Sequence, residues 1–296
     1  MNKVSRAVIA WAAACVALPV VAQSASAAPP QFGEYVALGD SWAADSTLNP
    51  GLVTEEFVPL SCAQSRGSYA KQVAAALAVP VFRDASCGGA QTVDMTGSQV
   101  ASRGVNPPQF DRLTPSTDLV TVLIGGNDAG LAAAVQACPT LDAGATPCLN
   151  SFVVNGVDRM SVNIAAAEPK VVATIEGIRA RAPHARILVL NYFKSVGAEG
   201  GCFPVIPISD GDAQWVGRKL IELNAMVARA TAVAGVELVD TYGSSDGHDA
   251  CKPAGVRWAE GLVPFSSDPV GPAVPFHPNQ LGADHQARSV LAAVGR

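Results

Sequence analysis

The stretch Tyr35-Val36-Ala37-Leu38-Gly39-Asp40-Ser41-Trp42 decides the fold of this 296-residue chain. A short apolar run ends at a glycine and an aspartate, and a serine follows directly. The same order returns further on, where the apolar run 119–124 ends at Gly125-Gly126-Asn127-Asp128. A continuous apolar run bounded by turn residues is typical of a strand buried on both faces. Both runs therefore predict strands of a parallel sheet, each delivering short polar side chains where it ends.

Strand-like and helix-like segments alternate through the rest of the chain. Short apolar segments predict strands at 81–85, 186–191 and 236–239, and alanine-rich or amphipathic segments predict helices at 68–79, 150–181, 212–234 and 281–294. Pro169 punctuates the second helical segment, which we expect to hold one or two helices. The alternation predicts an α/β fold, a three-layer αβα sandwich with a central parallel sheet. With 49% hydrophobic residues the chain can bury one sizeable core, so we expect a single domain over residues 28–296.

Composition and charge narrow the class of partner. Charged residues make up 15% of the chain, the formal net charge is −5, and no basic run occurs. Nucleic-acid binding proteins need such a basic footprint to neutralise phosphates. We therefore expect no nucleic-acid partner, and a monomer is the default expectation.

Residues 1–27 have the layout of a secretory signal peptide. A basic start is followed by the apolar run 7–22 and by small residues at 25–27, after which we place the cleavage. A retained membrane anchor is one alternative, but the apolar run is short for a bilayer span. Lipid attachment at Cys15 is another, although the residues before it match that processing poorly. We expect the protein to be secreted into the extracellular space.

The cysteines agree with export. Cys15 lies in the leader, and six remain. An even set in an exported chain suggests disulfide bonds. Proximity favours a small loop closed by Cys138 and Cys148, while the other pairs do not follow from spacing. A zinc site is the alternative, but no CxxC pair or histidine cluster accompanies these cysteines.

Three polar residues form a candidate reactive group. Ligands of open parallel sheets bind beyond the carboxyl ends of the strands, where Ser41 and Asn127 are expected. Taken singly, Ser41 is equally suited to cap a helix, and a residue such as Asn127 is more often part of a turn. His277 lies in a loop before the last helix, beside a proline that restricts the backbone. Because a serine hydroxyl needs an imidazole within hydrogen-bond reach to act as a nucleophile, His277 favours the catalytic interpretation of Ser41.

With these residues in view, the chain resembles the SGNH hydrolase superfamily, also called GDSL esterases and lipases, over essentially its whole mature length. Four blocks carry the resemblance in the right order: Gly39-Asp40-Ser41-Trp42, Cys87-Gly88-Gly89-Ala90, Gly125-Gly126-Asn127-Asp128 and His277-Pro278. Two further stretches, 247–251 and 258–262, are similar to the secreted, disulfide-bonded actinobacterial branch. The resemblance implies a flavodoxin-like fold and a secreted hydrolase of carboxylic esters, that is, an esterase, lipase or phospholipase.

The resemblance also implies roles for single residues. Ser41 would be the nucleophile of an acyl-enzyme mechanism and His277 its general base. The backbone N–H groups of Ser41 and Gly89 and the side-chain amide of Asn127 would hold the oxyanion, with no metal or organic cofactor. The resemblance further implies three sequential disulfide bonds: Cys62–Cys87, Cys138–Cys148 and Cys202–Cys251.

One position departs from the pattern. Most relatives carry an aspartate three residues before the histidine, and here that position is Val274. In one hypothesis a backbone carbonyl, most simply that of Val274, accepts the hydrogen bond from the far nitrogen of His277, which makes a Ser–His dyad. In the other, Asp268 folds back as a third member. We favour the carbonyl, which can fix the tautomer without adding a charge.

The substrate stays open at this level. Acyl glycerols, phospholipids or simple esters are the leading expectation, with transient contact to a lipid surface. A long acyl chain needs an apolar groove, and the aromatic candidates to line it are Trp42, Phe203, Trp258, Phe265 and Phe276. One alternative is a deacetylase of acetylated polysaccharide, and another is a non-catalytic binding protein on the same fold.

Overall fold

A five-stranded parallel sheet forms the centre of the computed structural model, which describes residues 31–54, 60–102, 104–262 and 273–296. The strand order is β2-β1-β5-β8-β9, and every neighbouring pair is parallel. The strands are β1 (Glu34–Gly39), β2 (Val81–Asp84), β5 (Leu119–Leu123), β8 (Arg186–Leu190) and β9 (Glu237–Val239). The central strands β1 and β5 are buried at every position, as their continuous apolar runs predict.

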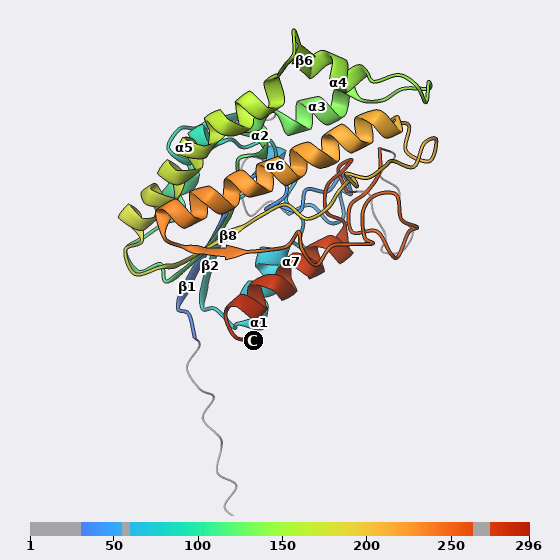
Figure 1. The fold of residues 1–296 in the computed structure, drawn as a ribbon. Helices are drawn as coiled ribbons and strands as arrows, with labels where there is room; N and C mark the ends of the chain where they lie inside the picture. The colour runs from blue at the N-terminus through green and yellow to red at the C-terminus, as the bar shows by residue number, and fades with distance from the viewer. Residues whose placement is uncertain (1–30, 55–59, 103, 263–272) are drawn as a thin grey trace, which may run out of the picture.

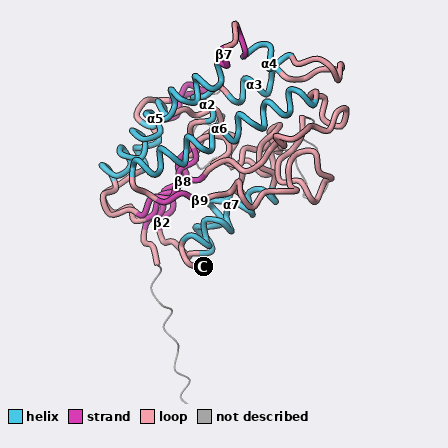
Figure 2. Tube along the Cα trace, viewed as in Figure 1, coloured by secondary structure: helices cyan, strands magenta, loops and turns pink. Residues whose placement is uncertain are grey.

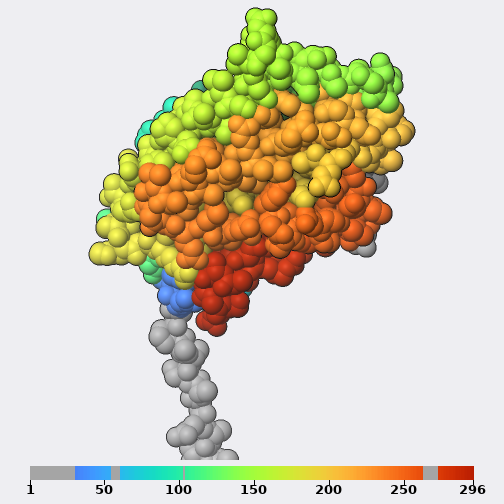
Figure 3. Space-filling model, viewed as in Figure 1, coloured from blue at the N-terminus to red at the C-terminus, as the bar shows by residue number. Residues whose placement is uncertain are grey.

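Four helices cover the two faces of the sheet and complete the αβα sandwich. They are α1 (Tyr69–Ala76), α5 (Arg159–Arg181), α6 (Asp210–Ala234) and α7 (Gln280–Ala293). Figure 1 shows α5 and α6 side by side on one face, and α1 and α7 together on the other. In Figure 3, α6 crosses the visible face as a broad band above the red surface of α7. The predicted three-layer fold is confirmed.

Smaller elements decorate the connections between these layers. The short α-helices are α2 (Gly126–Ala129), α3 (Leu131–Ala137) and α4 (Pro147–Phe152), and the 3₁₀ turns are η1 (Leu60–Cys62), η2 (Thr92–Met95) and η3 (Gln109–Arg112). Two small antiparallel hairpins pair β3 (Gln99–Ala101) with β4 (Gly104–Asn106) and β6 (Val153–Val154) with β7 (Val157–Asp158). In Figure 2 the loops gather on the right of the view, beyond the ends of the strands. This is the end of the sheet where the site lies.

The segment 150–181 differs in part from its predicted division at Pro169. Helix α4 ends at Phe152, and α5 then runs without a break through Pro169. Asp158 caps the start of α5, because its side chain accepts hydrogen bonds from the N–H groups of Met160 and Ser161. Proline removes one backbone donor, but the buried stripe on either side of it keeps the helix packed on the core.

Three disulfide bonds tie down the long loops. They join Cys62 to Cys87, Cys138 to Cys148, and Cys202 to Cys251, so the sequential pairing is confirmed. The leader predicted at 1–27 and Asp268 lie outside the described residues. Among the helices of the described ranges, none is both long and apolar enough to cross a membrane.

Candidate active site

The site lies where β1 and β5 end side by side. Ser41 follows β1 in a turn whose start is fixed by the backbone, since Asp40 N–H donates to the carbonyl of Leu123 at 3.0 Å. Asn127 lies in the first turn of α2, directly after β5. His277 comes from the far end of the chain, two residues before the Asn279 cap of α7. The sheet order therefore brings residues 236 positions apart in sequence to one edge.

Ser41 and His277 are in direct hydrogen-bond contact. The distance between Oγ of Ser41 and Nε2 of His277 is 2.7 Å. This distance suits proton transfer from the hydroxyl to the imidazole when the oxygen attacks a carbonyl. Ser41 and His277 are each partly exposed as residues, so a substrate has access to them, although protein encloses most of the imidazole.

The far nitrogen of the imidazole is held by a carbonyl, but not by the predicted one. Nδ1 of His277 lies 2.8 Å from the carbonyl oxygen of Pro275. The carbonyl of Val274 instead accepts the backbone N–H of His277 at 3.0 Å and closes a turn. Phe276, between them, adopts a left-handed conformation with φ of 58°, which aims the Pro275 carbonyl at the ring. The choice of Val274 is therefore wrong by one residue.

Burial keeps the imidazole neutral. It lowers the pKa of His277 from 6.5 to about 4, and the hydrogen bond to Pro275 opposes this shift only in part. A carboxylate partner would stabilise the imidazolium and raise the pKa. A neutral carbonyl orients the ring without that effect, so the base is free of its proton through the neutral pH range.

The loop that follows Cys87 brings Gly89 to the same edge. The Cys62–Cys87 disulfide and a 3.0 Å hydrogen bond from Gly88 N–H to the Cys62 carbonyl brace this loop. Nε2 of Gln99 donates to the carbonyl of Gly88 at 2.8 Å and holds it from the other side. Gly89 has φ of 77°, in the left-handed region where a side chain would be strained.

Asn127 connects this loop to the end of β5. One hydrogen of its Nδ2 donates to the carbonyl of Ala90 at 3.0 Å, which orients the amide and leaves its second hydrogen available. Within the described residues, the backbone N–H groups of Ser41 and Gly89 have no hydrogen-bond partner. The turns that carry these three donors are linked to one another, because Cys87 N–H donates to the carbonyl of Gly39 at 3.0 Å and Asn127 donates to Ala90. Donors of this kind can stabilise an oxyanion.

A cavity of about 280 Å³ lies beside the dyad. Ser41, Asn127 and His277 are among the residues that line it. Its walls are largely apolar and come from α3, α6 and the segment before His277: Leu131, Ala132, Val135, Val216, Leu220, Leu262, Val274, Pro275 and Phe276. A largely apolar pocket lined by a few polar groups suits a substrate that carries an acyl chain.

The aromatic candidates separate into lining and scaffold residues. Trp42 and Phe276 line the cavity, whereas Phe203 and Trp258 do not, and Phe265 lies outside the described residues. Trp258 is stacked between His248 and His285, with ring centroids 3.8 and 4.2 Å away. Its predicted role in a groove is therefore wrong, because both faces of its ring are occupied.

Two residues of the site, Pro275 and Tyr192, were not predicted from the sequence. Pro275 escaped because the direction of a carbonyl depends on the conformation of the next residue. Tyr192 was not identified because it lies one residue beyond the predicted strand 186–191, although it lines the cavity together with Ser41. Its place just after β8, at the same edge as Ser41 and Asn127, was the available signal.

One cluster has the residue types of a metal site. The potential ligand atoms of Cys138, Cys148 and Asp212 all lie within 4.8 Å of one another, and this is the one such group among the described residues. The two sulfur atoms are joined in a disulfide bond. Both oxygens of Asp212 accept backbone N–H groups, from Cys148 and Leu149, so the cluster is accounted for as a brace between α4 and α6.

Comparisons with known proteins point in one direction. The model of the GDSL-like lipase/acylhydrolase family matches residues 37–285. Lipase 2 of Streptomyces coelicolor is 36% identical, in an alignment that covers 100% of this chain and 98% of that protein. The crystal structure of an extracellular lipase from Streptomyces rimosus superposes with a TM-score of 0.69 at 25% identity, covering 88% of this chain and 99% of that one. The crystal structure of a phospholipase A1 from Streptomyces albidoflavus has the same fold, with a TM-score of 0.68 at 23% identity over 88% of this chain and 99% of that one.

Proposed function

Because the chain belongs to the GDSL-like lipase/acylhydrolase family, we propose that its hydrolysis of carboxylic esters is carried out by a Ser41–His277 dyad. The observation that carries the proposal is the 2.7 Å contact between Oγ of Ser41 and Nε2 of His277. The neutral imidazole is ready to accept a proton, and the Pro275 carbonyl holds it in the tautomer whose Nε2 carries a lone pair.

The reaction proceeds as acyl transfer in two steps. Oγ of Ser41 forms a bond to the acyl carbon while its proton passes to Nε2 of His277. That proton then passes to the leaving alcohol as the ester C–O bond breaks. In the second step water adds to the acyl-enzyme and gives one proton to Nε2 of His277. The bond between the acyl carbon and Oγ of Ser41 then breaks, His277 returns the proton to Oγ, and the carboxylic acid leaves.

The oxyanion of both steps is assigned to three donors. They are the backbone N–H groups of Ser41 and Gly89 and the side-chain amide of Asn127. Support comes from the two backbone donors that lack a partner among the described residues and from the orientation of Asn127 by Ala90. One such donor typically contributes about 3–4 kcal/mol to lowering the barrier.

The apolar cavity favours lipid or simple acyl esters as substrates. Its volume of about 280 Å³ leaves room for more than an acetyl group, and Val216 and Leu220 of α6 form part of its wall. A deacetylase of polysaccharide is the second candidate, on the ground that the fold is shared with sugar esterases. Export of the protein is part of the proposal and is supported by the three disulfide bonds.

A panel of nitrophenyl esters from acetate to palmitate tests both points, with wild type and Ser41→Ala compared. We expect activity that rises from acetate to a medium chain, and a loss of about 10⁴-fold or more in kcat for Ser41→Ala. Activity confined to acetate would favour the sugar esterase. Equal activity of Ser41→Ala would refute the dyad.

A further inference from the structure

Tyr192 lies directly beneath the two turns that carry Ser41 and Asn127. It follows β8 by two residues, and its side chain is 2% exposed. Its hydroxyl has two partners, one from each turn. It donates to Oδ2 of Asp40 at 2.5 Å and accepts the backbone N–H of Gly126 at 2.9 Å.

The hydrogen bond to Asp40 connects Tyr192 to the turn that carries Ser41. Oδ1 of Asp40 accepts the backbone N–H of Trp42 at 2.9 Å, so the carboxylate spans Ser41 from the residue before it to the residue after it. Asp40 is buried, and desolvation raises its pKa to about 7, against hydrogen bonds from Tyr192 and the backbone that favour the charged form. The hydroxyl of Tyr192 is thus one of the few groups that stabilise this carboxylate.

The hydrogen bond from Gly126 connects Tyr192 to the turn that carries Asn127, since Gly126 directly precedes Asn127. A Cβ atom added at position 126 would lie 2.9 Å from the hydroxyl oxygen of Tyr192 and 3.1 Å from its ring. The approach of Tyr192 therefore accounts for a glycine at this position. The same short distances show that the hydroxyl of Tyr192 packs tightly against the backbone of this turn.

Tyr192 is itself held from the helical layer. The backbone N–H of Tyr192 donates to Oδ1 of Asn224 at 3.0 Å, and Nδ2 of Asn224 donates back to the Tyr192 carbonyl at 2.7 Å. Asn224 lies in the middle of α6, which packs along α5. The hydroxyl is therefore a fixed point to which both turns are tied.

We propose that Tyr192 is a positioning residue of the esterase, whose hydroxyl sets the Ser41 turn and the Asn127 turn relative to one another so that their oxyanion donors converge. The inference rests on the proposed function. The single hydrogen of the hydroxyl is donated to Asp40 and one of its lone pairs accepts the N–H of Gly126, so its contacts in the structure are with the two turns. Small displacements of groups that bind the transition state cost rate more than substrate affinity.

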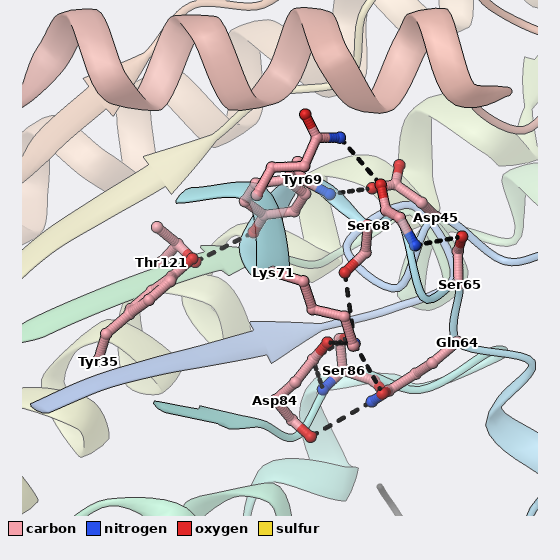
Figure 4. A network of polar contacts seen from close by, with 12 residues as sticks. Tyr35, Asp45, Gln64, Ser65, Ser68, Tyr69, Lys71, Asp84, Ser86 and Thr121 are labelled. Atoms are coloured by element: carbon pink, nitrogen blue, oxygen red, sulfur yellow. Dashed lines mark hydrogen bonds and ion pairs between the residues drawn. The ribbon is translucent and has the colours of Figure 1, made fainter. Parts of the chain in front are cut away.

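Tyr35 provides a matched control for the removal of a buried hydroxyl. It is fully buried on β1, and its hydroxyl is 2.8 Å from Oγ1 of Thr121. Thr121 also accepts the hydroxyl of Tyr69 at 3.1 Å, as Figure 4 shows. None of these three residues lines the cavity. Tyr35→Phe therefore removes a buried hydrogen bond without touching either turn.

The experiment compares Tyr192→Phe, Tyr35→Phe, Ser41→Ala and wild type on nitrophenyl butyrate, with active sites counted by fluorophosphonate labelling. We expect Tyr192→Phe to lower kcat by about 10- to 100-fold with KM within about twofold. Tyr35→Phe should lower the melting temperature but keep kcat within about twofold of wild type. If wild type lacks Ser41-dependent esterase activity, the proposed function itself fails.

The inference is overturned if Tyr192→Phe keeps the kcat of wild type, or if both tyrosine variants lose kcat equally. Should Tyr192→Phe be poorly folded, Gly126→Ala perturbs the same contact from the other side and should give the same loss in kcat at unchanged KM. Asp40→Asn combined with Tyr192→Phe should cost less than the product of the single losses, because both changes break one network. Independent, multiplicative losses would contradict it.

Discussion

Two polar regions of the molecule differ in whether they contain charged groups. One lies between α1 and the end of β2, and the other follows the end of β1. The first, here called the lysine cluster, consists of Gln64, Lys71, Asp84 and Ser86 (Figure 4). Nζ of Lys71 lies 2.5 Å from Oδ2 of Asp84, and the other carboxylate oxygen accepts the hydroxyl of Ser86 at 2.5 Å. The second region is the dyad of Ser41 and His277 with the oxyanion donors beside it. There the neutral imidazole of His277 is hydrogen-bonded to the neutral carbonyl of Pro275.

The difference shows what each region is built for. In the lysine cluster every charge meets an opposite charge or a donor, and the cluster ties α1 to the end of β2. In the dyad the base has no carboxylate beside it among the described residues, and two backbone donors are left open. A saturated network stabilises the fold, whereas an unsaturated one can respond to charge that develops in a substrate.

Asn127→Ala should show the largest difference between an effect on catalysis and an effect on stability. We expect kcat to fall by about 10²- to 10³-fold while the free energy of unfolding changes little, because the amide is an oxyanion donor. Steady-state kinetics and urea unfolding measure the two effects. Gln99→Ala is the control, since it removes a brace on the Gly89 loop without removing a proposed donor. A similar kcat for the two variants would mean that Asn127 only supports the loop.

Lys71→Met tests the opposite case. It leaves Asp84, whose side chain is 1% exposed, without its cation, so we expect a loss of about 3 kcal/mol in the free energy of unfolding and an unchanged kcat for the folded enzyme. Arg229→Met is the matched control: it breaks the exposed pair with Glu168 and should cost less than about 1 kcal/mol. Equal losses in the two variants would show that the lysine cluster contributes no more than a surface ion pair.

The parts of the fold that follow from periodicity were predictable. The runs 119–124 and 186–191 indicated buried strands, and β5 and β8 occupy them almost residue for residue. The hairpins β3–β4 and β6–β7 were not predicted, because strands of two or three residues carry no periodic signal. The segment 150–181 holds two helices, within the expectation of one or two, but the break falls between α4 and α5 and not at Pro169, since burial of one continuous stripe outweighed a local breaker.

The site divides in the same way. Ser41, Asn127 and His277 stand at strand ends or before a helix, and side chains at such places could be identified from the sequence alone. The Pro275 carbonyl could not, because its direction depends on the left-handed conformation of Phe276. The role of Tyr192 is tertiary: its hydroxyl meets Asp40 and Gly126 only when β1, β5 and β8 lie side by side.

The pH profile gives the finest test of the comparison. The imidazole must be neutral to accept a proton, and burial sets the pKa of His277 at about 4, so kcat/KM should fall as the pH drops through about 4. An exposed histidine, or one facing a carboxylate, would lose activity at pH 6.5 or above. Asp40→Asn should leave this inflection in place, because the pKa of Asp40 lies higher, at about 7. Unfolding measured at each pH separates protonation of the base from loss of structure. An acid limb at or above 6.5 that persists in folded Asp40→Asn would mean that His277 has a carboxylate partner after all, and the contrast with the lysine cluster would disappear.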